Sequence, residues 1–180
     1  MRLLLLLVIN FFRFLSCKMR YGRRYVSSFF QRIHPGCRIR LFNKGKVYVG
    51  KNCEFESGCD IQVHADAFLS IGEETYMNHY CIISAQKSII IGSHCMLGPS
   101  VKIFDNDHEF SREEGVKTSL TKESIVIGNN CWLASNVVVL KGSKIGNNCV
   151  IGAGCIISGD IPDGSLVKLQ RNQCVTMIRS

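Results

Sequence analysis

The first 46 residues of the chain lack acidic side chains altogether. The whole sequence has 22 Lys or Arg and 14 Asp or Glu in 180 residues, but residues 1–46 hold 11 of the basic residues and none of the acidic ones. Residues 47–180 therefore carry 11 basic and 14 acidic side chains, so the two parts have formal charges of +11 and −3, which sum to the net +8. The excess positive charge belongs to an N-terminal arm rather than to a folded surface.

The arm also lacks an uninterrupted apolar run long enough to cross a bilayer. It begins "MRLLLLLVINFFRFLSCKMRYGRR", where Asn10 and Arg13 break the run before the roughly 20 residues that a spanning helix needs. We therefore expect an arm over residues 1–46 whose first 24 residues form a helix in the membrane interface. Its headgroup contacts would come from Lys18, Arg20, Arg23 and Arg24.

Three other interpretations of the arm are open. The apolar residues could pack on the domain itself or on a neighbouring subunit. Arg2 followed by an apolar stretch and "LSC" also has the pattern of a secretory signal peptide. Nucleic acid is the weakest partner, because the basic cluster is fused to an apolar run and not interleaved with base-stacking aromatics.

The cysteines lack paired spacing. The chain has 10 of them, yet no CxxC pair occurs, which argues against a zinc site or a disulfide framework. So many unpaired thiols are typical of a reducing compartment. We therefore predict a cytoplasmic protein, associated through its arm with the inner face of the membrane, and no metal.

A six-residue repeat dominates the rest of the sequence. From Val49 onward, units such as "VGKNCE", "IGSHCM", "IGNNCW" and "IGNNCV" begin with a large apolar residue and place a small one fifth. A fixed short period is the signature of a repeat architecture, and six residues suit a short strand plus a turn. Three such strands make one triangular coil of about 18 residues, so the sequence predicts an all-β parallel solenoid.

The fifth position explains most of the cysteines. There a small apolar group would fill the inner corner of a coil, as free cysteine does in many cores. The cysteines at this position are Cys53, Cys59, Cys81, Cys95, Cys131, Cys149 and Cys155. We expect all of them to be buried.

The repeat has one long interruption. It runs to "IFDNDH", which ends at His108, and resumes at Ile127. The intervening "HEFSREEGVKTSLTKES" is polar.

Two stretches carry a resemblance to a known family. Residues 124–162, "SIVIGNNCWLASNVVVLKGSKIGNNCVIGAGCIISGDIP", resemble the C-terminal signature of the hexapeptide-repeat acetyltransferases, especially the galactoside, maltose and capsular-polysaccharide O-acetyltransferases. "YMNHYCIIS" and "IIIGSHCMLGPSVKIFDNDHEF" resemble the acceptor-site coil and catalytic-histidine segment of the same family. The resemblance implies a left-handed β-helix over residues 47–165, a C-terminal cap over 166–180, a projecting loop at about 108–124, and a homotrimer with active sites between subunits.

The resemblance also implies an activity, which is transfer of acetyl from acetyl-CoA to a saccharide hydroxyl without an acyl-enzyme. His108 would be the general base, and Asn78 would contact the acceptor. The other ring nitrogen of His108 would be held by a backbone carbonyl or by a carboxylate, with Asp105, Asp107 and Glu109 as candidates. Residues expected at the donor or the oxyanion are Trp132, the main-chain amide of Ser135, Ala153 and Ser158, with Lys141, Lys144, Lys168 and Arg171 as candidate phosphate contacts.

Each assignment has a plainer alternative. Asn78 is also an ordinary turn residue, and Trp132 suits intersubunit packing as well as donor contact. The acceptor could instead be an amino sugar, serine or an antibiotic, and a non-enzymatic scaffold would use the same solenoid. A zinc enzyme of this fold is disfavoured, because the chain has no pair of histidines spaced five apart.

Overall fold

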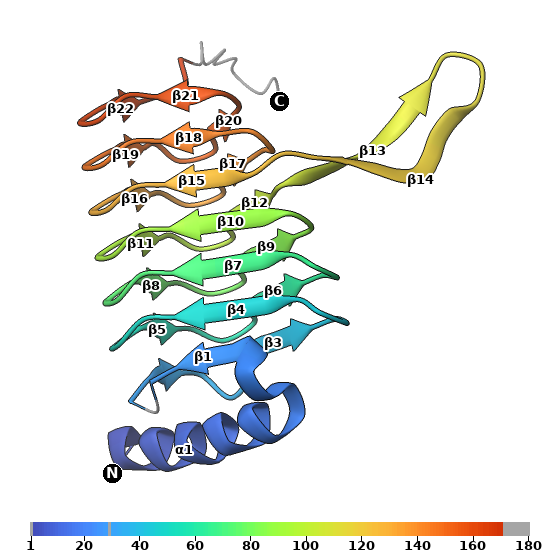
Figure 1. Cartoon of the computed structure of the whole chain (residues 1–180). Helices are drawn as coiled ribbons and strands as arrows, with labels where there is room; N and C mark the ends of the chain where they lie inside the picture. The colour runs from blue at the N-terminus through green and yellow to red at the C-terminus, as the bar shows by residue number, and fades with distance from the viewer. Residues whose placement is uncertain (1, 29, 171–180) are drawn as a thin grey trace, which may run out of the picture.

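The chain winds into a triangular prism of stacked coils, closed at one end by a helix (Figure 1). The computed structural model describes residues 2–28 and 30–170. Each coil contributes one short parallel strand to each of three faces, named here after their first strands. The β1 face consists of β1 (Tyr25–Ser27), β4 (Lys46–Val49), β7 (Phe68–Ile71), β10 (Ser88–Ile91), β15 (Ile125–Ile127), β18 (Lys144–Ile145) and β21 (Asp160–Ile161).

The other two faces follow the same order. The β2 face consists of β2 (Arg32–Ile33), β5 (Glu54–Phe55), β8 (Tyr76–Met77), β11 (Met96–Leu97), β16 (Trp132–Leu133), β19 (Val150–Ile151) and β22 (Leu166–Val167). The β3 face consists of β3 (Arg38–Leu41), β6 (Asp60–Val63), β9 (Ile82–Ala85), β12 (Lys102–Phe104), β17 (Val138–Val139) and β20 (Ile156–Ile157). In Figure 1 the strands nearest the viewer run leftward while the coils rise, so the β-helix is left-handed as expected.

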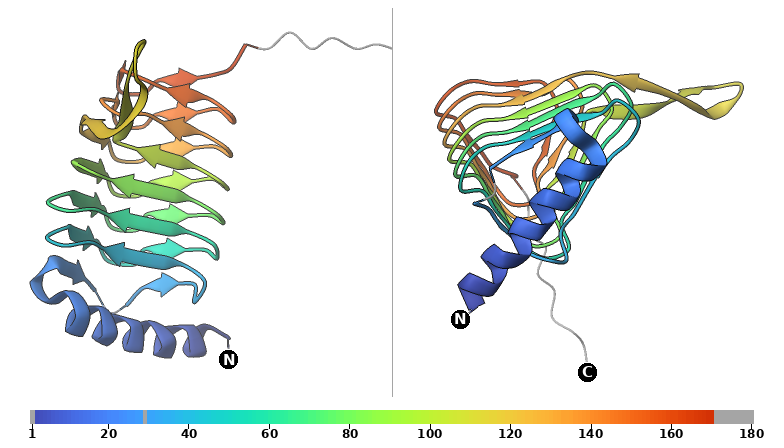
Figure 2. Two further views of the ribbon diagram at one scale, coloured as in Figure 1. Left: turned by 90° about the vertical axis from the view of Figure 1, so that its right-hand side faces the viewer. Right: turned by 60° about the horizontal axis from the view of Figure 1, so that its bottom comes forward.

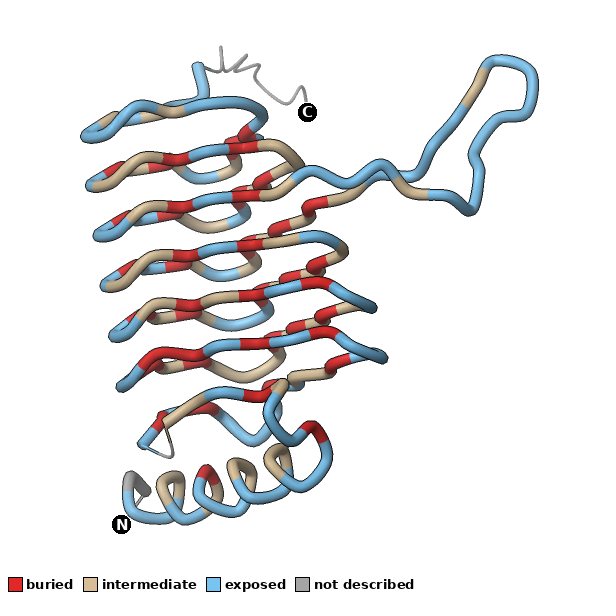
Figure 3. Tube along the Cα trace, viewed as in Figure 1, coloured by how far each residue is buried: buried red, intermediate tan, exposed pale blue. Residues whose placement is uncertain are grey.

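The predicted register is confirmed. Val49 pairs with Ile71, Ile71 with Ile91, Ile91 with Ile127, and Ile127 with Ile145, so the repeat starts stack directly above one another. The seven fifth-position cysteines are all buried, at 0–2% exposure. Figure 3 shows buried residues recurring at intervals along the coils, except in the last coil, where residues 158–170 are exposed or half-buried.

The corner thiols also bind consecutive coils together. Cys95 Sγ donates to the carbonyl of Gly128 at 3.1 Å, and Cys131 Sγ donates to that of Gly146 at 3.0 Å. Where the corner holds Thr75, its Oγ1 donates to Gly92 O at 3.0 Å in the same way. A fifth-position cysteine is therefore both a core side chain and a weak donor to the next turn.

The first coil lies within the segment assigned to the arm. Strands β1 to β3 span residues 25–41 and pair with β4 to β6, so the solenoid strands begin 22 residues before the predicted boundary at residue 47. Ile33 and Cys37 are buried at 1% and 4% exposure, four residues apart like the first and fifth positions of the later units. Their unit, "IHPGCR", carries the repeat in a stretch whose basic side chains conceal it.

The helix α1 (Arg2–Tyr21) lies across the N-terminal end of the prism and is followed by a short 3₁₀ turn, η1 (Gly22–Arg24) (Figure 2). Asn10 is 3% exposed, and its Nδ2 donates to Ile33 O at 3.1 Å. Arg13 Nη2 donates to the carbonyls of His34 and Pro35, at 3.0 and 3.1 Å. The helix thus covers the open end of the core with a face that includes Phe14 and Tyr21.

One further segment leaves the prism. Strands β13 (Asn106–Ser111) and β14 (Gly115–Lys122) form an antiparallel hairpin that projects from one edge, which is the predicted loop at 108–124 (Figures 1 and 2). Of the predicted cap at 166–180, residues 166–170 are described and include β22, while 171–180, Arg171 among them, lie outside the described residues. Within the described ranges no helix has the length and apolarity to span a bilayer.

Candidate active site

His108 stands on the projecting hairpin, outside the packed column. It lies on β13 opposite Leu120 of β14, beside an irregularity in the pairing between His108 and Phe110. Its Nδ1 is 2.9 Å from the main-chain oxygen of Lys117 on the other strand. Because a carbonyl only accepts hydrogen bonds, this contact places the proton on Nδ1 and leaves Nε2 as the unprotonated nitrogen of the neutral ring.

The three carboxylates considered as partners of His108 bind elsewhere. Asp107 Oδ2 is 3.3 Å from Lys141 Nζ, and Glu109 Oε2 accepts from Ser119 Oγ at 2.7 Å. Asp105 is fully buried and accepts from the main-chain amides of residues 86–88 at 2.7–2.9 Å. The backbone carbonyl is therefore the group that orients the imidazole.

A cavity of about 320 Å³ lies beside His108. The hairpin supplies most of its wall, and Lys141 comes from the coil above. Lys141 also donates to Thr121 Oγ1, so the base of the hairpin is tied to that coil. This arrangement holds a basic nitrogen at a solvent-open site whose position is set by several polar contacts.

A second site is a groove on the β2 face, with a volume of about 610 Å³. It brings together five of the predicted residues: Asn78, Trp132, Ser135, Ala153 and Lys168. Trp132 is half exposed, in register with Met96 below it and Val150 above it. The wall is mainly apolar, and Lys168 lies at its C-terminal end.

Two main-chain amides along this groove have no acceptor among the described residues. Ser135 and Ala153 occupy equivalent turn positions in successive coils, and neither N–H donates a hydrogen bond, although the Ser135 carbonyl accepts from Gly154 N at 2.9 Å. The equivalent position one coil earlier is Pro99, which has no N–H. Unpaired amides in an apolar groove are suited to a carbonyl or oxyanion ligand.

Asn78 lies just after β8 at the edge of the same groove. Its main-chain N–H donates to Leu97 O at 2.8 Å, and its Oδ1 accepts from the His79 amide at 2.7 Å. These contacts fix the Asn78 side chain at the turn.

His108 and Ser158 lie apart from this group. Both follow strands of the β3 face, at the edge where the chain crosses to the β1 face, whereas the five groove residues lie along the β2 face. Lys144 is exposed on the β1 face and lines neither cavity. One chain therefore carries His108 and the unpaired amides on different edges of the prism.

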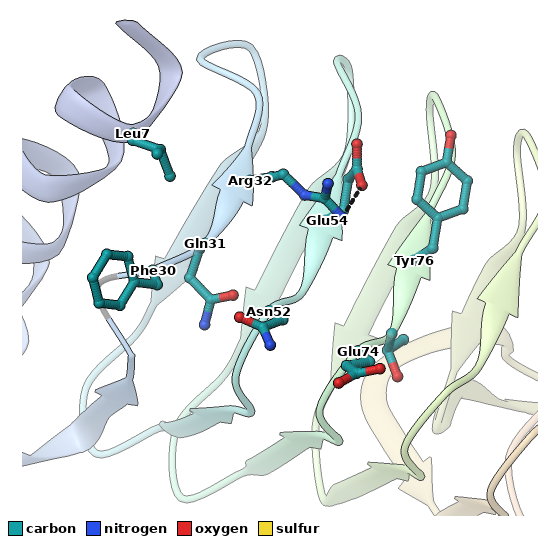
Figure 4. A pocket seen from close by; sticks show the side chains of 9 residues that line it. Leu7, Phe30, Gln31, Arg32, Asn52, Glu54, Glu74 and Tyr76 are labelled. Atoms are coloured by element: carbon teal, nitrogen blue, oxygen red, sulfur yellow. Dashed lines mark ion pairs between the residues drawn. The ribbon is translucent and has the colours of Figure 1, made fainter. Parts of the chain in front are cut away.

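Sequence reasoning missed a third cavity and the residue that joins it to the groove. This cavity, of about 590 Å³, lies between α1 and the lower coils of the β2 face (Figure 4). An ion pair between Arg32 and Glu54, at 2.7 Å, lies on its wall. Tyr76 lines both this cavity and the groove, and partial burial, with Glu56 and Glu54 nearby, raises its pKa. The alternation of inward and outward side chains along a strand would have shown that Tyr76 points outward, but it would not have shown what Tyr76 faces.

No cluster of three or more His, Cys, Asp or Glu side chains suited to a metal ion occurs in the described part of the chain. His94 is a turn residue at φ 56°, 3.3 Å from Glu74, and His79 bonds to Ser57 Oγ at 2.9 Å. Both are solvent-facing turn residues.

Comparison with known proteins identifies a family. The family model "Bacterial transferase hexapeptide (six repeats)" matches residues 124–159. The chain is 31% identical over 152 residues to WbbJ of Escherichia coli K12, named for O-acetyl transfer in lipopolysaccharide biosynthesis, covering 74% of this chain and 76% of that protein. It is 33% identical over 129 residues to the galactoside O-acetyltransferase of Lactococcus lactis IL1403, covering 72% of this chain and 62% of the relative.

A solved structure supports the fold. The hexapeptide-repeat acetyltransferase from Vibrio cholerae O1 biovar eltor, complexed with acetyl-coenzyme A, matches with a TM-score of 0.52 at 23% identity. The match covers 76% of this chain and 64% of that one.

Proposed function

This chain belongs to the hexapeptide-repeat acetyltransferases, and on that premise we propose that it transfers acetyl from acetyl-CoA to a saccharide hydroxyl in the synthesis of a surface or capsular polysaccharide. The observation that carries the proposal is the contact of His108 Nδ1 with the Lys117 carbonyl. It leaves Nε2 free to accept a proton, which is the property that a sugar hydroxyl requires of a catalyst at neutral pH.

In the proposed reaction the sugar oxygen attacks the thioester carbonyl while its proton passes to Nε2 of His108. The tetrahedral oxyanion accepts a hydrogen bond from the Ser135 N–H, and a donor of this kind is worth about 3 kcal/mol. The C–S bond then breaks, the proton on Nε2 passes to the departing thiolate of CoA, and the acetyl ester of the sugar is released. The transfer is direct, with no acyl-enzyme.

The groove on the β2 face fits the donor. Its apolar wall, with Trp132 and Met96, suits a pantetheine arm, and the Ala153 N–H is available to an amide carbonyl of that arm. Lys168, at the C-terminal end of the groove, would contact a phosphate of the donor. Ser158, on another edge, would contact a donor held by a neighbouring subunit.

The separation of His108 from the groove supports a homotrimer as the active form. The reaction needs the base next to the thioester, but one chain holds His108 and the proposed donor groove on different edges. In the proposed trimer the hairpin of one subunit reaches the groove of the next, so that Asn78 and His108 meet at a saccharide between two copies.

The first test is calorimetric titration of acetyl-CoA, with the oligomeric state checked by light scattering. We expect a trimer that binds about one acetyl-CoA per subunit and releases CoA thiol when saccharides are added. A well-folded trimer with no affinity for acetyl-CoA would refute the proposal. If the protein binds acetyl-CoA and transfers acetyl to an amine but to no hydroxyl, the proposed donor stands and the proposed acceptor class is wrong.

A further inference from the structure

The helix α1 has two faces, and only one of them packs on the solenoid. The inner face carries Asn10, Phe14, Cys17 and Tyr21, which are buried or lie against the core. The opposite face carries large apolar side chains with 41–84% of their surface exposed. These are Leu4, Leu5, Val8, Phe11, Phe12, Leu15 and Met19, called here the outer stripe.

The outer stripe is continuous. At 3.6 residues per turn its members fall within about 120° of the helix circumference, on the side opposite the packed residues. Figure 3 shows exposed surface along the side of α1 turned away from the coils, and Figure 2 shows the helix lying across the end of the prism. A contiguous apolar surface of this kind on the outside of a protein is typical of a docking site.

The charge around the stripe identifies its partner. No acidic residue occurs before residue 47, and Arg20 and Arg23 are exposed at the C-terminal end of the helix. An apolar stripe bordered by positive charge only is complementary to a lipid surface with anionic headgroups. A protein partner would instead need an acidic surface around an apolar groove.

We propose that the outer stripe inserts into an anionic lipid surface and that the coil stack stands upright on the membrane. The helix axis lies across the stack, so the whole stripe can enter the interface at once while Arg20 and Arg23 contact headgroups. The packed face keeps α1 attached to the solenoid through Asn10 and Arg13. The helix α1 is thus both a structural cap and a membrane anchor, which combines two interpretations that the sequence left separate.

The position of the cavities suggests how an upright coil stack would receive its substrate. This inference rests on the proposed function. The cavity next to α1 is lined by Leu7 of the helix and by Tyr76, and Tyr76 also lines the groove that holds Asn78 and Ser135 (Figure 4). A saccharide chain attached to a lipid in that membrane would therefore meet the β2 face from the helix end. The lipid-proximal sugars would pass the Arg32–Glu54 pair before reaching the catalytic residues.

Vesicle flotation of the full-length protein tests the proposal. One set of vesicles is phosphatidylcholine alone, and the other contains about one-third phosphatidylglycerol, at low salt and at about 1 M salt, where the Debye length is about 3 Å. We expect flotation with the anionic vesicles at low salt. Leu5→Gln with Phe12→Gln should reduce the bound fraction at least about tenfold, and Arg20→Gln with Arg23→Gln should weaken binding about fivefold per charge.

A matched control distinguishes the effect of the outer stripe from the effect of removing any exposed apolar side chain. Val116→Gln removes an exposed apolar side chain from the hairpin, far from α1, and should float like the wild type. Circular dichroism and the thermal midpoint must match the wild type for each variant. Acetyl-CoA titration on the same samples reports the proposed function separately, so loss of lipid binding and absence of transferase chemistry are distinguishable.

Three results would overturn the proposal. They are no flotation of the wild type, equal flotation with neutral and anionic vesicles, or stripe variants that float unchanged. If light scattering without lipid instead shows assemblies that the stripe variants dissociate, and no vesicle binds, then a second copy of the chain covers the stripe.

Discussion

Nδ1 of His108 lies 2.9 Å from the main-chain oxygen of Lys117, across the two strands of the projecting hairpin. The contact joins the candidate base to the backbone of the opposite strand and not to a side chain. Its geometry depends on the hairpin register, in which His108 faces Leu120. The tautomer is thus set by the fold of the hairpin, and no single side-chain substitution on β14 removes the acceptor.

His108→Ala is expected to lower kcat for acetyl transfer by about 10²- to 10⁴-fold, because the attacking hydroxyl then has no positioned base. The affinity for acetyl-CoA should be unchanged, since the groove on the β2 face is intact. Steady-state release of CoA thiol and calorimetric titration measure the two quantities. His94→Ala is the matched control, because His94 is a surface turn residue paired with Glu74, and its activity should equal that of the wild type. A fully active His108→Ala would exclude the proposed mechanism.

Ser135→Pro tests the oxyanion donor without changing the rest of the groove. It removes the main-chain N–H, and the equivalent position one coil earlier is already Pro99, so the backbone there accepts proline. We expect kcat to fall about 10²- to 10³-fold, with a change in unfolding free energy below about 1 kcal/mol.

Ser135→Ala is the control for that substitution. It removes the hydroxyl but keeps the N–H, so its kcat should remain close to that of the wild type. If Ser135→Ala instead loses as much activity as Ser135→Pro, the hydroxyl and not the amide is the donor.

Asp105→Ala is expected to destabilise the protein by about 3 kcal/mol or more. The carboxylate is fully buried and accepts three main-chain amides of the preceding coil, and each buried donor left unpaired costs about 1–3 kcal/mol. The Asp105 carbonyl also accepts from Glu123 N at 3.0 Å, so the residue holds both ends of the hairpin. Urea unfolding measures the effect. Asp107→Ala is the control, because it removes only a partly exposed ion pair with Lys141. A loss of unfolding free energy above about 1 kcal/mol in this variant would contradict the role given to the buried Asp105.

The coils were predictable because one rule repeats. Each unit from Val49 onward buries its first residue, so a shift of register would expose residues such as Ile127. The fifth-position cysteines are buried as the period predicts, whereas Ala65, Lys87 and Asp107, at fifth positions of units on the β3 face, are exposed. The Lys117 contact was not predictable, because it joins a side chain to a main-chain oxygen and depends on hairpin pairing that has no repeat. The end cap was also hidden: the apolar residues of α1 divide between two faces, and composition does not say which face packs.

The separation of the site residues could be partly predicted from the sequence. Ser135 and Ala153 fall at equivalent positions of successive coils, and Asn78 lies one position earlier in the corresponding turn of its own coil, so stacking brings all three to one edge. His108 and Ser158 belong to units on a different face, so the same rule places them apart. What the period does not encode is a groove, because outward side chains such as Trp132 and Tyr76 vary freely from coil to coil.

Tyr25 makes the stability of the first coil sensitive to alkaline pH. Burial raises the pKa of Tyr25 to about 12, whereas an unfolded tyrosine titrates near 10. The folded state therefore keeps the phenol proton that the unfolded state releases, so the stabilisation is fully present below about pH 10 and is lost as pH rises toward 12. At one pH unit above the unfolded pKa the loss is about 1.4 kcal/mol. Urea unfolding at pH 8 and pH 11 should show this extra loss in the wild type but not in Tyr25→Phe, and equal losses in both proteins would show that another group is responsible.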